Sequence, residues 1–138
     1  MHALRYFYLG SAAILVAVAA NLIHSPTAIA EWIRIKTDER QNIYYVDTTT
    51  IETKGSQRYF WSYIVFGTPY EAENKLVYSS AYYLSVNCQE QLFNLHFKEL
   101  LDENRQVIKE YDYSDNNVAG APTPGSSEEA SLKFVCSR

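Results

Sequence analysis

The feature that most constrains this fold is a pair of cysteines, Cys88 and Cys136, the only two among 138 residues. Cys136 lies in the closing stretch SLKFVCSR, two residues before the end of the sequence. Two cysteines in an exported domain are typical of one disulfide, whereas in a reducing compartment they stay free. The compartment therefore decides whether the two parts of the chain are tied together.

The N-terminus has the layout of an export signal. A single arginine precedes an apolar run over residues 7–23, and Pro26 then breaks any helix. The small-residue motif AIA follows at residues 28–30, as a signal peptidase requires. We therefore predict a signal peptide over residues 1–30 and a mature domain over residues 31–138. The alternative is an uncleaved membrane anchor, because the apolar run is about long enough to span a bilayer.

Net charge and predicted export together limit the classes of molecule that this domain can bind. The chain has 12 Lys+Arg and 16 Asp+Glu, and loss of residues 1–30 removes one arginine, which leaves 11 − 16 = −5. Nucleic acid requires a basic face, so we predict no nucleic-acid binding. We expect the domain in the periplasm or at the extracellular cell surface, and at a membrane only if the signal segment is retained. Because an exported domain is in an oxidising environment, we predict one disulfide between the two cysteines. The alternative is two buried free thiols.

The mature part is rich in aromatic and β-branched residues, which occur in short runs bounded by turn residues. These runs predict six strands, at residues 31–36, 43–47, 58–67, 75–88, 91–101 and 106–113. Residues 68–74 are predicted as a loop, because Pro69 cannot continue a ladder. Residues 114–127 are predicted as a second loop, since they are rich in glycine and proline.

Alternation assigns faces to two of these strands. In the fourth strand the period-2 set that begins at Leu76 is the more apolar one, and it directs Cys88 toward the core. In the fifth strand Phe93, Leu95 and Phe97 share one face.

The sequence pattern over residues 126–136 predicts a helix. Ser126 and Glu129 have the spacing of a capping box, and Leu132, Val135 and Cys136 fall on one side of the helix. The predicted fold is therefore α+β: a six-stranded antiparallel β-sheet with a C-terminal α-helix packed on one face and pinned by a disulfide.

Several motifs follow one another in a characteristic order. They are Trp32, YYVDTTTI at residues 44–51, Gly55, an aromatic strand around Trp61, YYLSVNC ending in Cys88, and PGSSEEASLKFVC ending in Cys136. This order resembles the surface-adhesin protein E-like family of bacterial exported proteins. The resemblance implies a six-stranded antiparallel sheet whose C-terminal helix is tied to one face by a disulfide.

The resemblance also implies an adhesive role, because the best-known member binds host matrix proteins and can dimerise. This sequence departs from that adhesin in two respects. It has no lipoprotein cysteine and no marked lysine cluster. We therefore carry over the fold and the disulfide residues, but not the host ligands.

No set of residues marks a catalytic or metal site. His96 is the single histidine after residue 30, and we expect it to lie solvated on the polar face of the fifth strand, since no G-x-S-x-G motif marks a nucleophile. The segment DYSDNN at residues 112–117 is a weak match to a calcium loop, because it lacks the turn glycine and the closing glutamate. We predict no enzyme activity, no metal and no cofactor.

The third strand suggests where binding would occur. Tyr59, Trp61 and Tyr63 fall on one face, while Phe60 and Ile64 fall on the other. One helix cannot cover both faces of a sheet, and exposed aromatic residues often mark a partner surface. Tyr59, Trp61 and Tyr63 are therefore the candidate binding face, with core packing alone as the alternative.

These inferences predict an exported, non-enzymatic binding module of the cell envelope. We expect an adhesin-like protein–protein interaction through the aromatic sheet face or the loops. The partner would be an unknown protein or a second copy of the chain. The alternative is a structural or assembly accessory protein of the envelope, membrane-tethered if the N-terminal segment is not cleaved.

Overall fold

The structure, a computed structural model, describes residues 29–115 and 119–138. Its strands are β1 (Trp32–Thr37), β2 (Ile43–Asp47), β3 (Glu52–Lys54), β4 (Gln57–Ala72), β5 (Lys75–Asn87), β6 (Leu92–Leu101), β7 (Val107–Asp112) and β8 (Ala119–Gly120). A single 3-10 turn, η1 (Thr48–Thr50), follows β2, and the helix α1 (Ser127–Cys136) ends the chain.

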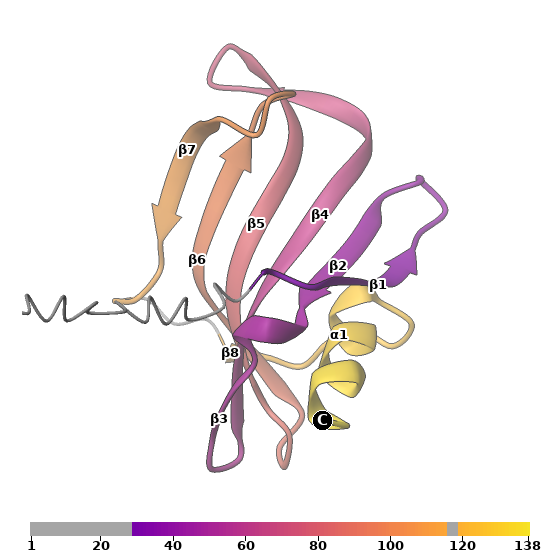
Figure 1. The fold of residues 1–138 in the computed structure, drawn as a ribbon, viewed down its shortest axis with the longest axis vertical. Helices are drawn as coiled ribbons and strands as arrows, with labels where there is room; N and C mark the ends of the chain where they lie inside the picture. The colour runs from indigo at the N-terminus through magenta and orange to yellow at the C-terminus, as the bar shows by residue number, and fades with distance from the viewer. Residues whose placement is uncertain (1–28, 116–118) are drawn as a thin grey trace, which may run out of the picture.

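All the strands join one antiparallel sheet in the order β1-β2-β4-β5-β6-β7, while β3 pairs with β4 and β8 pairs with β6. Figure 1 shows a strongly bent sheet, with α1 beside β1 and β2 and with β7 at the far side. The predicted α+β fold is confirmed, and the short strands β3 and β8 are additions to it.

The strand β4 is longer than predicted and runs past Pro69. Its register against β5 shifts between Val65 and Tyr70, so Pro69 lies in a bulge and needs no N–H for the ladder. The strand then turns at Glu73 and Asn74, whose φ angles of 52° and 57° match the positive values of a type I′ hairpin. The prediction of a loop over residues 68–74 was therefore wrong in most of its length.

A second bulge lies in β6 and changes the predicted faces. Tyr83 pairs with Phe97 and Leu84 with Leu95, which leaves His96 as the extra residue. Because one extra residue reverses the alternation, Phe97 lies on the opposite face from Leu95. The prediction that they share a face was wrong.

The core lies between α1 and one face of the sheet. Its most buried members come from both layers and are Val46, Phe60, Val86, Leu132 and Val135, none more than 5% exposed. The predicted alternation of β5 holds near α1 but fails farther away, since Leu76 is 51% exposed and Val77 is fully buried. At that end of β5 the buried side chain therefore lies on the face opposite α1.

The helix begins as its sequence predicts. The Ser126 hydroxyl accepts a hydrogen bond from the Glu129 N–H at 3.2 Å. The return bond of the capping box is displaced by one residue, because Glu129 Oε1 accepts from the N–H of Gly125 at 3.3 Å. Glu129 also forms an i,i+4 ion pair with Lys133 at 3.1 Å.

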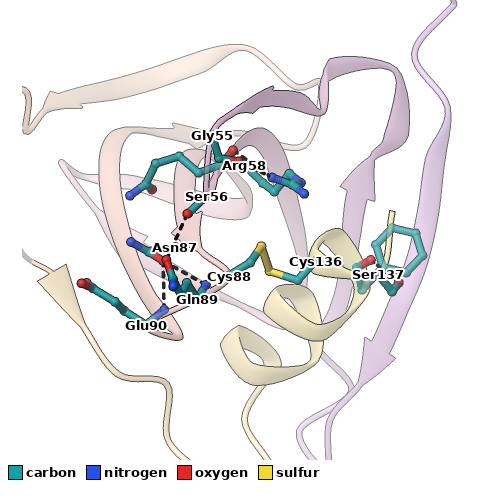
Figure 2. Close-up of a disulfide and its surroundings, with 11 residues drawn as sticks. Gly55, Ser56, Arg58, Asn87, Cys88, Gln89, Glu90, Cys136 and Ser137 are labelled. Carbon is teal, nitrogen blue, oxygen red and sulfur yellow. Dashed lines mark hydrogen bonds between the residues drawn. A yellow bond between two sulfur atoms is a disulfide. The ribbon is translucent and has the colours of Figure 1, made fainter.

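A disulfide between Cys88 and Cys136 fixes the last turn of α1 to the end of β5, with 5.5 Å between the two Cα atoms. Cys88 follows β5 directly instead of ending it, and its N–H donates to the carbonyl of Ser56 at 2.9 Å. Figure 2 shows Asn87 beside it, where the side-chain oxygen accepts the N–H of Gln89 at 3.0 Å. The predicted pairing and the predicted helix attachment are both confirmed.

Replacement of both cysteines by serine should lower the free energy of unfolding by about 4 kcal/mol, because the disulfide closes a loop of 48 residues in the unfolded chain. Urea unfolding of the oxidised wild type and of the Cys88→Ser/Cys136→Ser variant would measure this loss. Ser137→Ala is the matched control, since it changes the neighbouring residue and keeps the disulfide. Equal unfolding midpoints for the double variant and the oxidised wild type would contradict the expectation.

Candidate functional site

The face of the sheet opposite α1 carries a layer of aromatic side chains. Tyr59, Trp61 and Tyr63 lie together on this face, because they alternate along β4 with the core residues Phe60 and Ser62. Among the described residues α1 is the one α-helix, and it packs on the other face. The three residues singled out from the sequence therefore project from the face that the helix leaves uncovered.

Neighbouring strands extend this layer beyond β4. We call it the aromatic face, and its members are Trp32, Tyr45, Tyr59, Trp61, Tyr63, Tyr83, His96 and Phe97. Register brings them together, since Tyr45 pairs with Tyr63, and Trp61 pairs with Tyr83.

The rings of the aromatic face contact one another in two groups, one of Trp32, Tyr45 and Tyr63 and the other of the remaining five rings. The centroid of Trp61 lies 5.4 Å from that of Tyr83 and 6.1 Å from that of Phe97. The centroid of Tyr63 lies 5.7 Å from that of Trp32, which is 40% exposed at the edge of the layer. These separations are those of favourable tilted and edge-to-face pairs, so the layer is held in place by its own members.

His96 lies in this layer and not on a solvated polar face. Its Nε2 is 2.7 Å from the Ser85 hydroxyl, and its ring stacks on Tyr59 at 5.6 Å. Burial lowers the pKa of His96 below its usual value. Ser85 is only 1% exposed, and within residues 29–115 and 119–138 no carboxylate hydrogen-bonds the imidazole. The pair thus lacks the accessible nucleophile and the orienting acid of a hydrolase triad.

A groove opens at one end of the aromatic face, with a volume of about 450 Å³. Its lining residues are Trp32, Tyr45, Tyr63, Val65, Ala81, Leu101 and Arg105. Arg105 is the one charged residue of this lining, and it projects from the turn between β6 and β7. Sequence analysis missed the groove, because its walls come from five separate strands and a turn.

Acidic groups flank the groove on the same face. Ala81 pairs with Glu99, which in turn pairs with Glu110 on β7. Burial and the neighbouring Glu110 charge raise the pKa of Glu99. The centre of the aromatic face is therefore apolar, with Arg105, Glu99 and Glu110 at this border and the Lys54–Glu52 ion pair beside Tyr59 at the other.

The carboxylate at the start of the weak calcium motif serves a turn. Asp112 Oδ1 accepts hydrogen bonds from the Ser114 N–H at 2.9 Å and the Ser114 hydroxyl at 2.7 Å, which lower the pKa of Asp112. Residues 116–118 of that motif lie outside the described residues. Within the described part of the chain, no three His, Cys, Asp or Glu side chains form a group that could hold a metal ion.

No helix within residues 29–115 and 119–138 has the length and hydropathy needed to cross a membrane.

Known structures share this fold. Protein E of Haemophilus influenzae, in crystal form II, superposes with a TM-score of 0.57 at 13% identity and covers 77% of this chain and 87% of its own. A second structure of Haemophilus influenzae protein E gives a TM-score of 0.56 at 16% identity, with 77% and 83% covered. Protein E from non-typeable Haemophilus influenzae gives 0.54 at 15% identity, with 81% and 80% covered.

No curated protein matches the sequence significantly. The family model described as Surface-adhesin protein E matches residues 32–137, which is nearly all of the predicted mature domain. The antiparallel sheet, the terminal helix and its disulfide agree with the resemblance noted in the sequence. The chain belongs to the surface-adhesin protein E family.

Proposed function

We propose that this chain is an exported, non-enzymatic binding protein of the bacterial cell envelope, and that it attaches to a protein partner through the aromatic face. The observation that carries this proposal is the layer of eight ring side chains, arranged as two groups of contacting rings, on a sheet face without helical cover among the described residues. Tryptophan and tyrosine are enriched in protein interfaces and dominate their binding energy. The family description as a surface adhesin supports the same class of activity.

The shape and charge of this face favour a protein partner. The groove bordered by Trp32 and Tyr63 offers a recess for an apolar anchor side chain. Arg105, Glu99 and Glu110 provide polar groups around an apolar centre, which is the usual arrangement of an interface core and its rim. A nucleic acid would require a basic surface, whereas the chain carries a net charge of −4.

The position of Ser85 and His96 supports a non-enzymatic role. The serine hydroxyl is buried, and the imidazole rests between Tyr59 and Tyr83. Neutral His96 keeps the middle of the aromatic face uncharged, which favours burial against a partner.

Site-specific photo-crosslinking tests the binding face directly. A photoreactive phenylalanine analogue at position 63 or 32 should form adducts with a partner in intact cells, because both positions lie on the aromatic face. The matched control is position 133 on α1, where the Lys133 side chain is 73% exposed. Replacement of Trp61 by alanine should reduce the position-63 adduct about tenfold or more, as expected for an aromatic hot spot.

The mass of the crosslinked adduct distinguishes a different protein from a second copy of the chain. Adducts that form equally well at positions 63 and 133, or that persist in the Trp61→Ala variant, would refute the aromatic face as the binding surface.

The protonation of His96 provides an independent check of the buried centre. We expect its imidazole to titrate below 6.5, its usual pKa, because burial disfavours the charged form. As the pH falls, His96 is protonated at a higher pH in the unfolded chain than in the folded protein. The contribution of neutral His96 to the free energy of unfolding is therefore fully present above pH 6.5 and is lost as the pH is lowered. NMR titration of the imidazole and urea unfolding across this pH range would measure both effects.

His96→Gln is the control for that experiment, because it removes the titrating group and should flatten this part of the pH dependence. A His96 midpoint at or above 6.5 would show that the centre of the aromatic face is open to water.

Release of the domain as a free exported protein requires removal of the predicted signal peptide. Intact-mass measurement of the protein from the envelope fraction should give a chain that starts at Glu31, because the AIA motif at residues 28–30 is placed for cleavage. A mature chain that retains Met1 would contradict export as a cleaved protein and would indicate a membrane tether.

A further inference from the structure

A second hollow lies on the helix side of the sheet, apart from the aromatic face. It opens between the first turns of α1 and strands β2, β4, β5 and β6, and its volume is about 160 Å³. Its apolar lining consists of Phe60, Ile64, Leu84, Val86, Phe93 and Leu95. Neither the sequence motifs nor the proposed function accounts for it.

The size of this hollow matches one six-membered ring. An apolar cavity of about 150 Å³ lined by leucine, isoleucine and phenylalanine stays dry in another protein and binds benzene. The hollow here has nearly the same volume and a similar apolar wall, but six polar residues complete its lining and one side is open. It can therefore admit a ring from solvent without unfolding of the core.

Two serine hydroxyls line the hollow and remain accessible to solvent through it. Ser62 on β4 is 5% exposed and Ser131 on α1 is 7% exposed, and both line the hollow. Neither hydroxyl makes a side-chain hydrogen bond within the part of the chain that the structure describes. Both hydroxyls are therefore free to hydrogen-bond a ligand, which would take the place of water in the hollow.

The other polar lining residues are Tyr44, Tyr82, Ser127 and Glu128, and the hydroxyls of Tyr44 and Ser127 already donate to Asp38 and Glu128. The remaining two favour a neutral donor over an anion. Glu128 contributes a carboxylate, which only accepts hydrogen bonds and repels a second negative charge. Tyr82 also lines the hollow, and burial raises its pKa to about 12, so its hydroxyl stays protonated. The carboxylates of Glu128 and Glu129 in the first turn of α1 already balance the positive end of the helix dipole.

We propose that this hollow is a binding site for a small neutral ring compound of benzene size that carries one hydroxyl or amino group. The ring packs between Phe60, Leu84 and Phe93, and the polar group meets the hydroxyls of Ser62 and Ser131. Anionic rings are excluded by Glu128.

An NMR titration of the disulfide-bonded protein with phenol, benzene and benzoate tests this site. Phenol should bind saturably and shift the resonances of Ser62, Leu84 and Ser131. Benzene should bind at the same place with lower affinity, and benzoate should cause no shifts. The inference is overturned if phenol fails to saturate, if benzoate binds as well as phenol, or if the shifts map to Trp61 on the aromatic face.

Three variants assign the binding to this hollow. Ser62→Ala and Ser131→Ala should each weaken phenol about three- to tenfold and leave benzene unchanged, since each removes one neutral hydrogen bond. Ser131→Leu should fill the hollow and abolish binding of both compounds. Ala130→Leu is the matched control, because it adds the same side chain to α1 at a position outside the lining.

Unchanged phenol affinity in Ser131→Leu would overturn the site. If that variant does not fold, the two alanine variants still decide the question, because equal losses for phenol and benzene would contradict the assigned hydrogen bonds.

Discussion

The attachment of α1 to one face of the sheet determines the rest of this structure. The Cys88–Cys136 disulfide fixes the last turn of the helix, and Leu132 and Val135 bury its inner side against Phe60. A helix held at its C-terminal end and packed along its length cannot move to the other face. The sheet is thereby divided into a covered face with a conventional core and an uncovered face that must be stable in another way.

The uncovered face is stabilised by contacts among its own aromatic rings. Trp61, Tyr83 and Phe97 lie opposite one another on three successive strands, so their rings shield each other from water. An arrangement of this kind keeps large apolar side chains rigid before a partner arrives, which lowers the entropy lost on binding. The same division leaves the small hollow at the free, N-terminal end of α1, where the helix is farthest from its disulfide.

The sequence predicted the features that depend on local pattern. The six main strands, the capped helix and the inward direction of Cys136 follow from alternation, capping residues and spacing. Features set by strand register escaped prediction. The bulges at Pro69 and His96 each add residues to one strand but not to its partner. The local sequence does not show where the pairing register between the two strands shifts. Tyr59, Trp61 and Tyr63 were found from the alternation of one strand. Tyr45 and Tyr83 join them only through cross-strand register, and Phe97 only through the bulge at His96.

Hydroxyl-radical footprinting of the free and the partner-bound protein tests the division of the sheet most directly, because it reports the exposure of individual side chains on both faces. On binding, oxidation of Trp32 and Tyr63 should fall, while oxidation of Phe134 on α1 and of Tyr111 on β7 should stay the same. Protection of Phe134 with continued oxidation of Trp32 and Tyr63 would contradict the account, because the partner would then occupy the helix side of the molecule.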